Sequence, residues 1–102
     1  NSLTSPYPPS KGGVLQYTKN LASHVAKNGV RVNCVSPAFI TTELTKNILE
    51  DEFIGTKLKD RTPMNRFGKP EEVANVILFL SSDLSSYITG ADIPVDGGYL
   101  IL

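Results

Sequence analysis

Several features that mark particular classes of protein are scarce or absent in this sequence of 102 residues. The one cysteine, Cys34, cannot form an internal disulfide, and no cysteines and histidines are paired at zinc-site spacing, so we predict no metal. Ten basic residues balance ten acidic ones, which leaves no positive surplus to bind nucleic-acid phosphates. The longest apolar run, Val76 to Leu80, is far shorter than the ~20 residues that span a bilayer. We therefore expect no nucleic-acid partner and no membrane contact, and a cytoplasmic location.

The composition is otherwise that of an ordinary folded protein. Hydrophobic residues make up 40% of the chain and charged residues 20%, unlike the apolar-poor composition of disordered chains. A chain of this length has room for one small domain at most.

The first half of the sequence predicts a helix followed by a strand. Apolar residues at three- and four-residue spacing indicate an amphipathic helix between Pro9 and Lys27. Gly29 follows where many helices end on a left-handed glycine. The β-branched run Val30–Val35 is short and stops before Pro37, which is typical of a buried strand.

The second half predicts further helices and a second strand. Residues Thr41–Lys59 carry a broad apolar stripe that Gly55 interrupts, so we expect one or two helical pieces there. Pro70, followed by two glutamates, opens a helix that we expect to end near residues 81–82. The segment Ala91–Val95 then predicts a short strand, which contains a proline and should lie at a sheet edge.

The order of these elements is that of an α/β protein with a parallel sheet. Two strands alone do not make a stable sheet, and a parallel sheet needs cover on both faces. We therefore expect this arrangement of elements to be only part of a larger sheet, incomplete on its N-terminal side.

Tyr7 and Lys11 are candidate catalytic residues because they lie four positions apart at the start of the first helix. This spacing places both side chains on one helix face. A neighbouring ammonium favours the phenolate and so lowers the pKa of a tyrosine toward neutrality. The pair can thus exchange a proton with a carbonyl or an alcohol, although a bare Tyr-x-x-x-Lys is a weak motif.

Five blocks of the sequence form an ordered set of motifs. They are Tyr7–Gly13, Asn20–Ala22, Gly29–Pro37, Arg66–Ala74, and Tyr87–Gly90 with Val95–Gly98. In their order and spacing these blocks resemble the short-chain dehydrogenase/reductase family. The resemblance covers nearly the whole chain and implies a Rossmann-like subunit that moves hydride between NAD or NADP and a ketone or secondary alcohol. It implies further that the subunit assembles into a homodimer or homotetramer.

The resemblance assigns roles to individual residues. It makes Tyr7 the general acid in ketone reduction and the base in alcohol oxidation. Lys11 lowers the pKa of Tyr7 and binds the nicotinamide ribose, and both residues are thus expected to contact the cofactor. The segment after the first strand holds the nicotinamide, with the Ile40 backbone and the Thr42 hydroxyl on its carboxamide. The cofactor-binding positions of that segment are Pro37, Ala38, Ile40 and Thr42.

Other implications concern the extent of the chain. The family's active-site serine and Gly-rich phosphate-binding turn have no counterpart in this sequence. We therefore expect residues 1–102 to be the C-terminal segment of one NAD(P)-binding Rossmann-like domain of about 250 residues, with its last two strands and their helices. Residues Glu43–Lys59 would then form the substrate lid. The family's usual glycine is replaced by Ala38, a mild change if the backbone φ there is negative.

Two prolines after the tyrosine depart from the family pattern. A residue that precedes proline is pushed away from helical dihedral angles, so we expect regular helix no earlier than Pro9 and a displaced Tyr7. The alternative to an enzyme is a shortened, non-catalytic protein that acts as a binding or assembly partner.

Other residues have structural interpretations. We expect His24 to have a structural or surface role, not a catalytic one, and Cys34 to act as a small buried apolar residue. Gly12 and Gly13 weaken a helix, which suggests close packing against a cofactor or another subunit. The apolar tail Tyr99–Leu102 is expected in a core or an interface.

Overall fold

The computed structural model describes residues 7–99, and it describes side chains from residue 12 onward. The helical and strand elements alternate as the sequence predicts. In chain order they are α1 (Tyr7–Val25), η1 (Ala26–Asn28), β1 (Cys34–Pro37), α2 (Lys46–Leu49), α3 (Glu52–Asp60), α4 (Pro70–Leu80), η2 (Asp83–Ser85) and β2 (Asp92–Val95).

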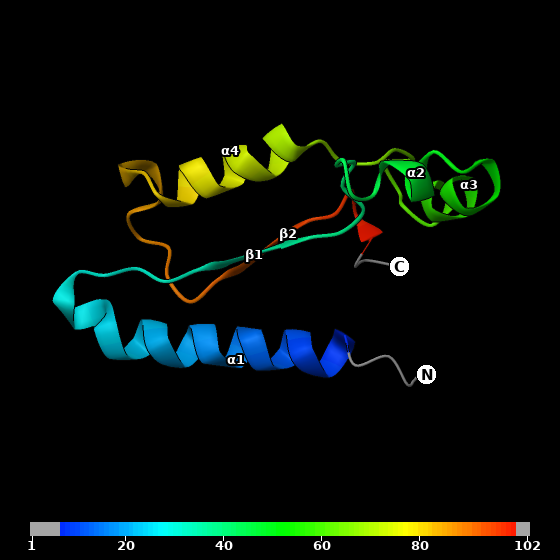
Figure 1. Ribbon diagram of the computed structural model, residues 1–102. Helices are drawn as coiled ribbons and strands as arrows, with labels where there is room; N and C mark the ends of the chain where they lie inside the picture. The colour runs from blue at the N-terminus through cyan, green and yellow to red at the C-terminus, as the bar shows by residue number, and fades with distance from the viewer. Residues whose placement is uncertain (1–6, 100–102) are drawn as a thin grey trace.

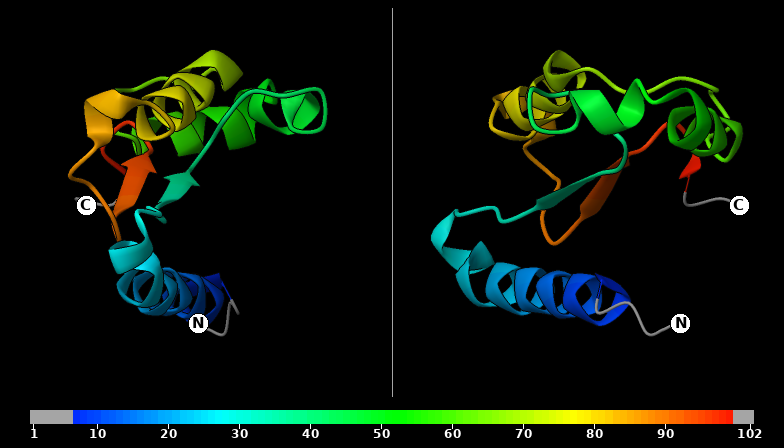
Figure 2. Two further views of the ribbon diagram at one scale, coloured as in Figure 1. Left: turned by 90° about the vertical axis from the view of Figure 1, so that its left-hand side faces the viewer. Right: turned by 45° about the vertical axis from the view of Figure 1, so that its right-hand side comes forward.

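A two-stranded parallel sheet forms the centre of the described structure. Cys34 of β1 pairs with Asp92 of β2, and the register continues to Pro37 and Val95. Figure 1 shows α1 on one face of this sheet and α4 on the other, and both helices run opposite to the strands. The two further views agree on these three layers (Figure 2). The predicted α/β order with parallel strands is confirmed.

The first helix begins two residues earlier than Pro9, so the prediction that Pro8 and Pro9 delay it is wrong. Both prolines fall in the first turn, where backbone N–H groups have no partner within the helix and a fixed φ is already helical. Tyr7 is therefore the first helical residue. At the other end, Gly29 closes η1 with a left-handed φ of 77°, which confirms the predicted glycine cap.

The first strand lies further along the chain than predicted. The expected strand Val30–Val35 starts too early, because β1 begins at Cys34 and includes Pro37. The preceding residues bond to a loop instead of a strand. The Val32 amide donates to the Thr89 hydroxyl, and the Val32 carbonyl accepts from the Gly90 amide at 2.7 Å.

Two helical pieces occupy the predicted region 41–59, but Gly55 does not separate them. The helical conformation is interrupted between Leu49 and Glu52. Asp51 caps α3 there, because its side chain accepts from the amides of Phe53 and Ile54. Gly55 lies inside α3 and is buried. The Leu49 carbonyl lies close to its Cα, where any other residue would carry a Cβ. The absent side chain thus permits contact between α2 and α3, and does not break the helix.

The remaining predicted elements are confirmed. Helix α4 begins at Pro70 and is closed by Ser81, and its Glu72 side chain accepts from the Lys69 amide at 2.9 Å. Strand β2 is followed by a turn at Gly97 and Gly98, which have φ values of 60° and 92°.

The core within the described residues is thin. Its buried apolar side chains are Ala22 and Leu49, whereas apolar side chains of α1 and α4 are exposed. The radius of gyration is 15.7 Å, compared with about 13 Å for a compact domain of this length. No helix among residues 7–99 is both long and apolar enough to cross a membrane.

Candidate functional site

The carboxyl ends of β1 and β2 point to one end of the molecule, and several segments gather there. Figure 1 shows that α1 and α4 both begin at this end and that α2 and α3 lie beyond it. Open α/β sheets bind their ligands in this position, outside the carboxyl ends of the strands. The candidate site is therefore the edge formed by the first turn of α1 and the loops that follow β1 and β2.

The segment after β1 is held in place by backbone bonds. The Ala38 amide donates to the Val95 carbonyl at 3.3 Å, which extends the sheet by one residue. Ile40 then forms a parallel bridge with Gly68. In this bridge the Gly68 amide donates to the Phe39 carbonyl at 2.9 Å, and the Gly68 carbonyl accepts from the Thr41 amide at 3.0 Å.

The Ile40 amide points away from this bridge because the residues on either side of it use the bonds to Gly68. Its carbonyl accepts from the Thr45 hydroxyl at 2.7 Å, whereas the described part of the chain offers its N–H no hydrogen-bond partner. The Thr42 hydroxyl is exposed and bonds to the Thr45 hydroxyl at 3.1 Å. Ile40 and Thr42 thus present a donor and an adaptable hydroxyl two residues apart.

An ion pair fixes the segment that enters α4. Arg66 donates two parallel bonds to the Glu72 carboxylate, at 2.9 and 2.8 Å, and a third to the Phe67 carbonyl at 3.1 Å. The hydrogen bonds from Arg66, followed by the one from the Lys69 amide, lower the pKa of Glu72 to about 2. Glu72 is therefore ionised at neutral pH, and one carboxylate holds residues on both sides of Gly68.

A pocket of about 300 Å³ lies between these segments. Its walls include apolar side chains from the loop after β1, the Arg66–Glu72 pair and the turn after β2. Phe39 also packs edge-on against Tyr99, with ring centroids 5.1 Å apart. The pocket is lined by Phe39, Ile40, Thr62, Met64, Arg66, Gly68, Glu72 and Pro94–Gly98.

The predicted site residues fall into two groups. Tyr7 and Lys11 lie in the first turns of α1, at the candidate edge, but their side chains are outside the described residues. Ile40 lines the pocket, whereas Pro37, Ala38 and Thr42 lie outside its lining.

The backbone at Ala38 accepts an alanine without strain. Among the described residues Asn65 is the one non-glycine residue with a positive φ. The replacement of the family's glycine by Ala38 is therefore mild, as predicted.

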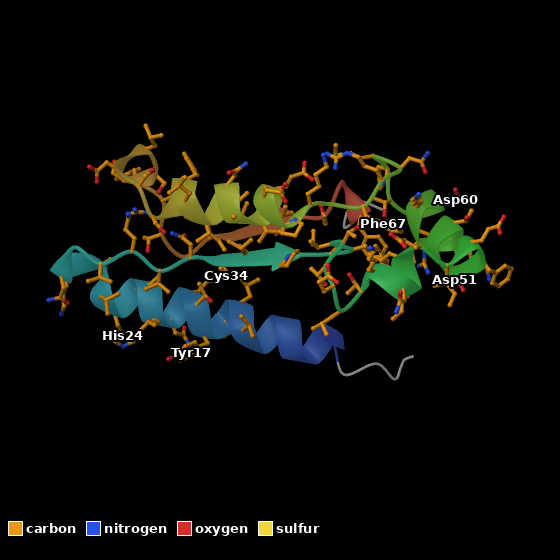
Figure 3. The ribbon with its side chains drawn as sticks, turned by 45° about the horizontal axis from the view of Figure 1, so that its top comes forward. Tyr17, His24, Cys34, Asp51, Asp60 and Phe67 are labelled. Atoms are coloured by element: carbon orange, nitrogen blue, oxygen red, sulfur yellow. The ribbon has the colours of Figure 1, made fainter. Side chains whose placement is uncertain are left out.

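The residues with structural interpretations agree with expectation in part. His24 is exposed, and its Nδ1 lies 2.8 Å from the Asn20 carbonyl oxygen within the same helix. Figure 3 shows His24 and Tyr17 directed away from the sheet. Cys34 is half-buried, not buried as expected, because the sheet has only thin cover here, and its Sγ lies 3.4 Å from Asp92 Oδ1. An alanine Cβ at Gly13 would meet no atom of this chain within 4 Å, and close packing against a cofactor or another subunit stays a prediction.

Metal-binding clusters are also absent from the described part of the chain, where no three His, Cys, Asp or Glu residues are arranged to hold an ion. Tyr99 is half-buried against Phe39, and the rest of the apolar tail lies outside the described residues.

Sequence reasoning missed the bonds that join Gly68 to the segment after β1. Arg66 and Glu72 are six residues apart, which is not a contact spacing within a helix. A signal was nevertheless present, because Glu72 occupies the third position of α4, where a carboxylate reaches back to the preceding amide.

Comparisons with known proteins agree on one group of relatives. A family model described as "Enoyl-(Acyl carrier protein) reductase" matches residues 2–100. The 3-oxoacyl-[acyl-carrier-protein] reductase FabG of Aquifex aeolicus is 50% identical over 92 residues, which make up 90% of this chain and 36% of that protein. The chain thus spans little more than a third of the length of this relative.

Two solved structures superpose closely on the fold. The 4-hydroxyisoleucine dehydrogenase complexed with NADH gives a TM-score of 0.90 at 30% identity, over 98% of this chain and 43% of that one. A short-chain type dehydrogenase/reductase from Mycobacterium ulcerans gives 0.88 at 36% identity, over 93% of this chain and 34% of that one.

Proposed function

The chain belongs to the short-chain dehydrogenase/reductase family, and on that premise we propose that it forms the C-terminal segment of an oxidoreductase subunit. Its structure is a partial α/β domain like those of its Rossmann-fold neighbours. The subunit would transfer hydride between NAD or NADP and a ketone or secondary alcohol. Membership of the family is thus the basis of a proposal about the activity of the whole protein.

The observation that carries the proposal is the Ile40 amide at the carboxyl edge of the sheet, which has no hydrogen-bond partner among residues 7–99. Ile40 is half-buried, and a backbone N–H in such a place is costly to leave unpaired unless water or a ligand accepts from it. A nicotinamide carboxamide has a carbonyl that can accept from Ile40 and an amino group that can donate to the exposed Thr42 hydroxyl. The donor set therefore fits this cofactor, with Pro37 and Ala38 leading the chain to it.

Tyr7 and Lys11 would perform the proton transfer. Both belong to the first turns of α1, which begins at the same end of the molecule as the loop after β1 (Figure 1). Tyr7 would donate its phenolic proton to a ketone oxygen during reduction and accept a proton from an alcohol during oxidation. Lys11, one turn further on, would stabilise the phenolate and bind the nicotinamide ribose. The cofactor, when bound, supplies or accepts the hydride.

The thin core supports the proposal that these residues are one part of a larger domain. Apolar side chains on both helices need cover, and two strands alone give a marginal sheet. A homodimer or homotetramer and a cytoplasmic location remain expectations drawn from the family. Mass spectrometry of the natural subunit should find a polypeptide about twice this length or more. A natural polypeptide of 102 residues would contradict that part of the proposal.

The activity is tested with the full-length subunit. We expect it to bind NADH or NADPH in a fluorescence titration and to oxidise the bound dinucleotide when a panel of ketones is added. A subunit that binds neither dinucleotide would refute the proposal and favour the non-catalytic alternative.

A further inference from the structure

The position of the Ile40 amide depends on a residue far away in the sequence. Gly68 bonds to Phe39 and to Thr41, the two neighbours of Ile40, through its own N–H and carbonyl. These two bonds fix the peptide planes on either side of Ile40 and so determine where its N–H points. Any shift of Gly68 would therefore be passed directly to the proposed cofactor contact.

The residues around Gly68 are anchored by one carboxylate. Glu72 accepts from Arg66 before Gly68 and from the Lys69 amide after it, with all three distances between 2.8 and 2.9 Å. Arg66 also donates to the carbonyl of Phe67, the residue just before Gly68. A fork of this kind fixes orientation as well as distance, because a planar guanidinium meets a planar carboxylate.

Side-chain packing at Gly68 adds a second constraint. An alanine Cβ at this position would lie 2.6 Å from Cδ1 of Ile40. The φ angle of Gly68 is not among the positive values, so an alanine would meet a steric conflict with Ile40 without backbone strain. The glycine therefore allows the Ile40 side chain to pack against the segment that leads into α4.

We propose that Glu72 and Arg66 are positioning residues that set the affinity for the nicotinamide cofactor by holding Gly68, and through it the Ile40 amide. This inference rests on the proposed function, because it concerns the same cofactor contact. The pair also anchors the end of the segment that contains α2 and α3. The proposed lid, Glu43–Lys59, is thus followed directly by the segment that this pair holds.

The test compares Glu72→Gln with Glu71→Gln in the full-length subunit. Glu71 is exposed and adjacent, and no described group bonds to its side chain, which makes it a matched control. We expect Glu72→Gln to raise the dissociation constant and KM for the cofactor about tenfold, the scale of one charge-assisted hydrogen bond. At saturating cofactor, kcat should change less than about threefold, since the lost interaction is made equally before and during reaction. Glu71→Gln should leave all three values unchanged.

Hydrogen exchange gives a readout that does not depend on the cofactor. In Glu72→Gln the Thr41 amide should exchange faster, whereas amides in the middle of α4 should keep their protection. General unfolding of α4 would raise both rates and would contradict a specific positioning role. Arg66→Lys, which keeps the charge but not the fork, should give an intermediate cofactor affinity.

Gly68→Ala provides a second variant because it leaves the carboxylate fork in place and changes the packing against Ile40 Cδ1, the flexible end of that side chain. Because Cδ1 can turn aside, Gly68→Ala should weaken cofactor binding less than Glu72→Gln does. Unchanged cofactor affinity and Thr41 exchange in both Glu72→Gln and Gly68→Ala would overturn the inference. Failure of the wild-type subunit to bind either dinucleotide would instead overturn the proposed function, and with it the cofactor role of this pair.

Discussion

Gly55 offers a direct test of the corner between α2 and α3, because two effects of a Gly55→Ala substitution oppose each other. Alanine in a helix interior stabilises by about 1 kcal/mol relative to glycine. The new Cβ, however, would overlap the Leu49 carbonyl, which is backbone and cannot rotate away. Overpacking of this kind costs typically about 1–3 kcal/mol. We expect the steric term to win, with a net loss of up to about 2 kcal/mol, confined to α2 and α3.

The assay is hydrogen exchange of the α2 and α3 amides in the full-length subunit, together with its thermal unfolding. Gly55→Ala should reduce protection in both helices, since they must separate to admit the methyl group. The adjacent exposed residue provides a control, because Thr56→Ala should change stability by less than about 0.5 kcal/mol. A Gly55→Ala variant with greater protection would show that helix propensity prevails and that the two helices do not approach this closely.

Two other predictions concern charged groups. The folded-state pKa of Glu72, about 2, lies below its usual value of 4.5, so its stabilising effect should be fully present above pH 4.5 and be lost as the pH falls through about 2. The difference in denaturation midpoint between wild type and Glu72→Gln should narrow over this range, and a constant difference would contradict the ion pair. Arg31 donates to the Ser82 and Ile88 carbonyls and to the hydroxyl of fully buried Ser85, so Arg31→Met should cost about 2–3 kcal/mol in chemical denaturation. The exposed Lys27→Met should cost little, and equal effects of the two variants would contradict a stabilising role for the Arg31 hydrogen bonds.

The order and type of the main elements were predictable from local signals. Pro70 with two following glutamates marks the start of α4, and Gly29 marks the end of the first helical segment, because both positions have strict backbone requirements. These requirements act within a few residues of the chain. Sequence periodicity can therefore detect them.

The errors in the fold prediction have tertiary causes. β1 begins at Cys34 because the partner segment opposite Val32 is a loop around Gly90, which no local pattern near Val32 reveals. Helix propensity alone predicts that Gly55 interrupts the helix. It lies inside α3 instead, where the close approach of the Leu49 carbonyl leaves no room for a side chain. The early start of α1 shows that prolines in a first turn fit a helix better than the restriction on the preceding residue suggests.

Family motifs predict residues of the candidate site within single segments, and their cofactor contacts stay a prediction, whereas the meeting of distant segments has no such signal. Ile40 and Thr42 were expected to bind the nicotinamide from their place after β1. The dependence of Ile40 on Gly68 was not, because 28 positions separate the two residues of this bridge. Such a pairing depends on the path of the chain through α2 and α3, which periodicity does not encode.

The central claim, that Tyr7 transfers the proton, is tested most directly by the kinetics of Tyr7→Phe in the full-length subunit. Removal of the hydroxyl should abolish turnover while leaving the dissociation constant for NADH or NADPH nearly unchanged. Lys11→Ala should impair both turnover and cofactor binding, because the Lys11 ammonium is proposed to contact the ribose as well as the phenol. Near-normal turnover by Tyr7→Phe would contradict the assignment of the general acid and base to this residue.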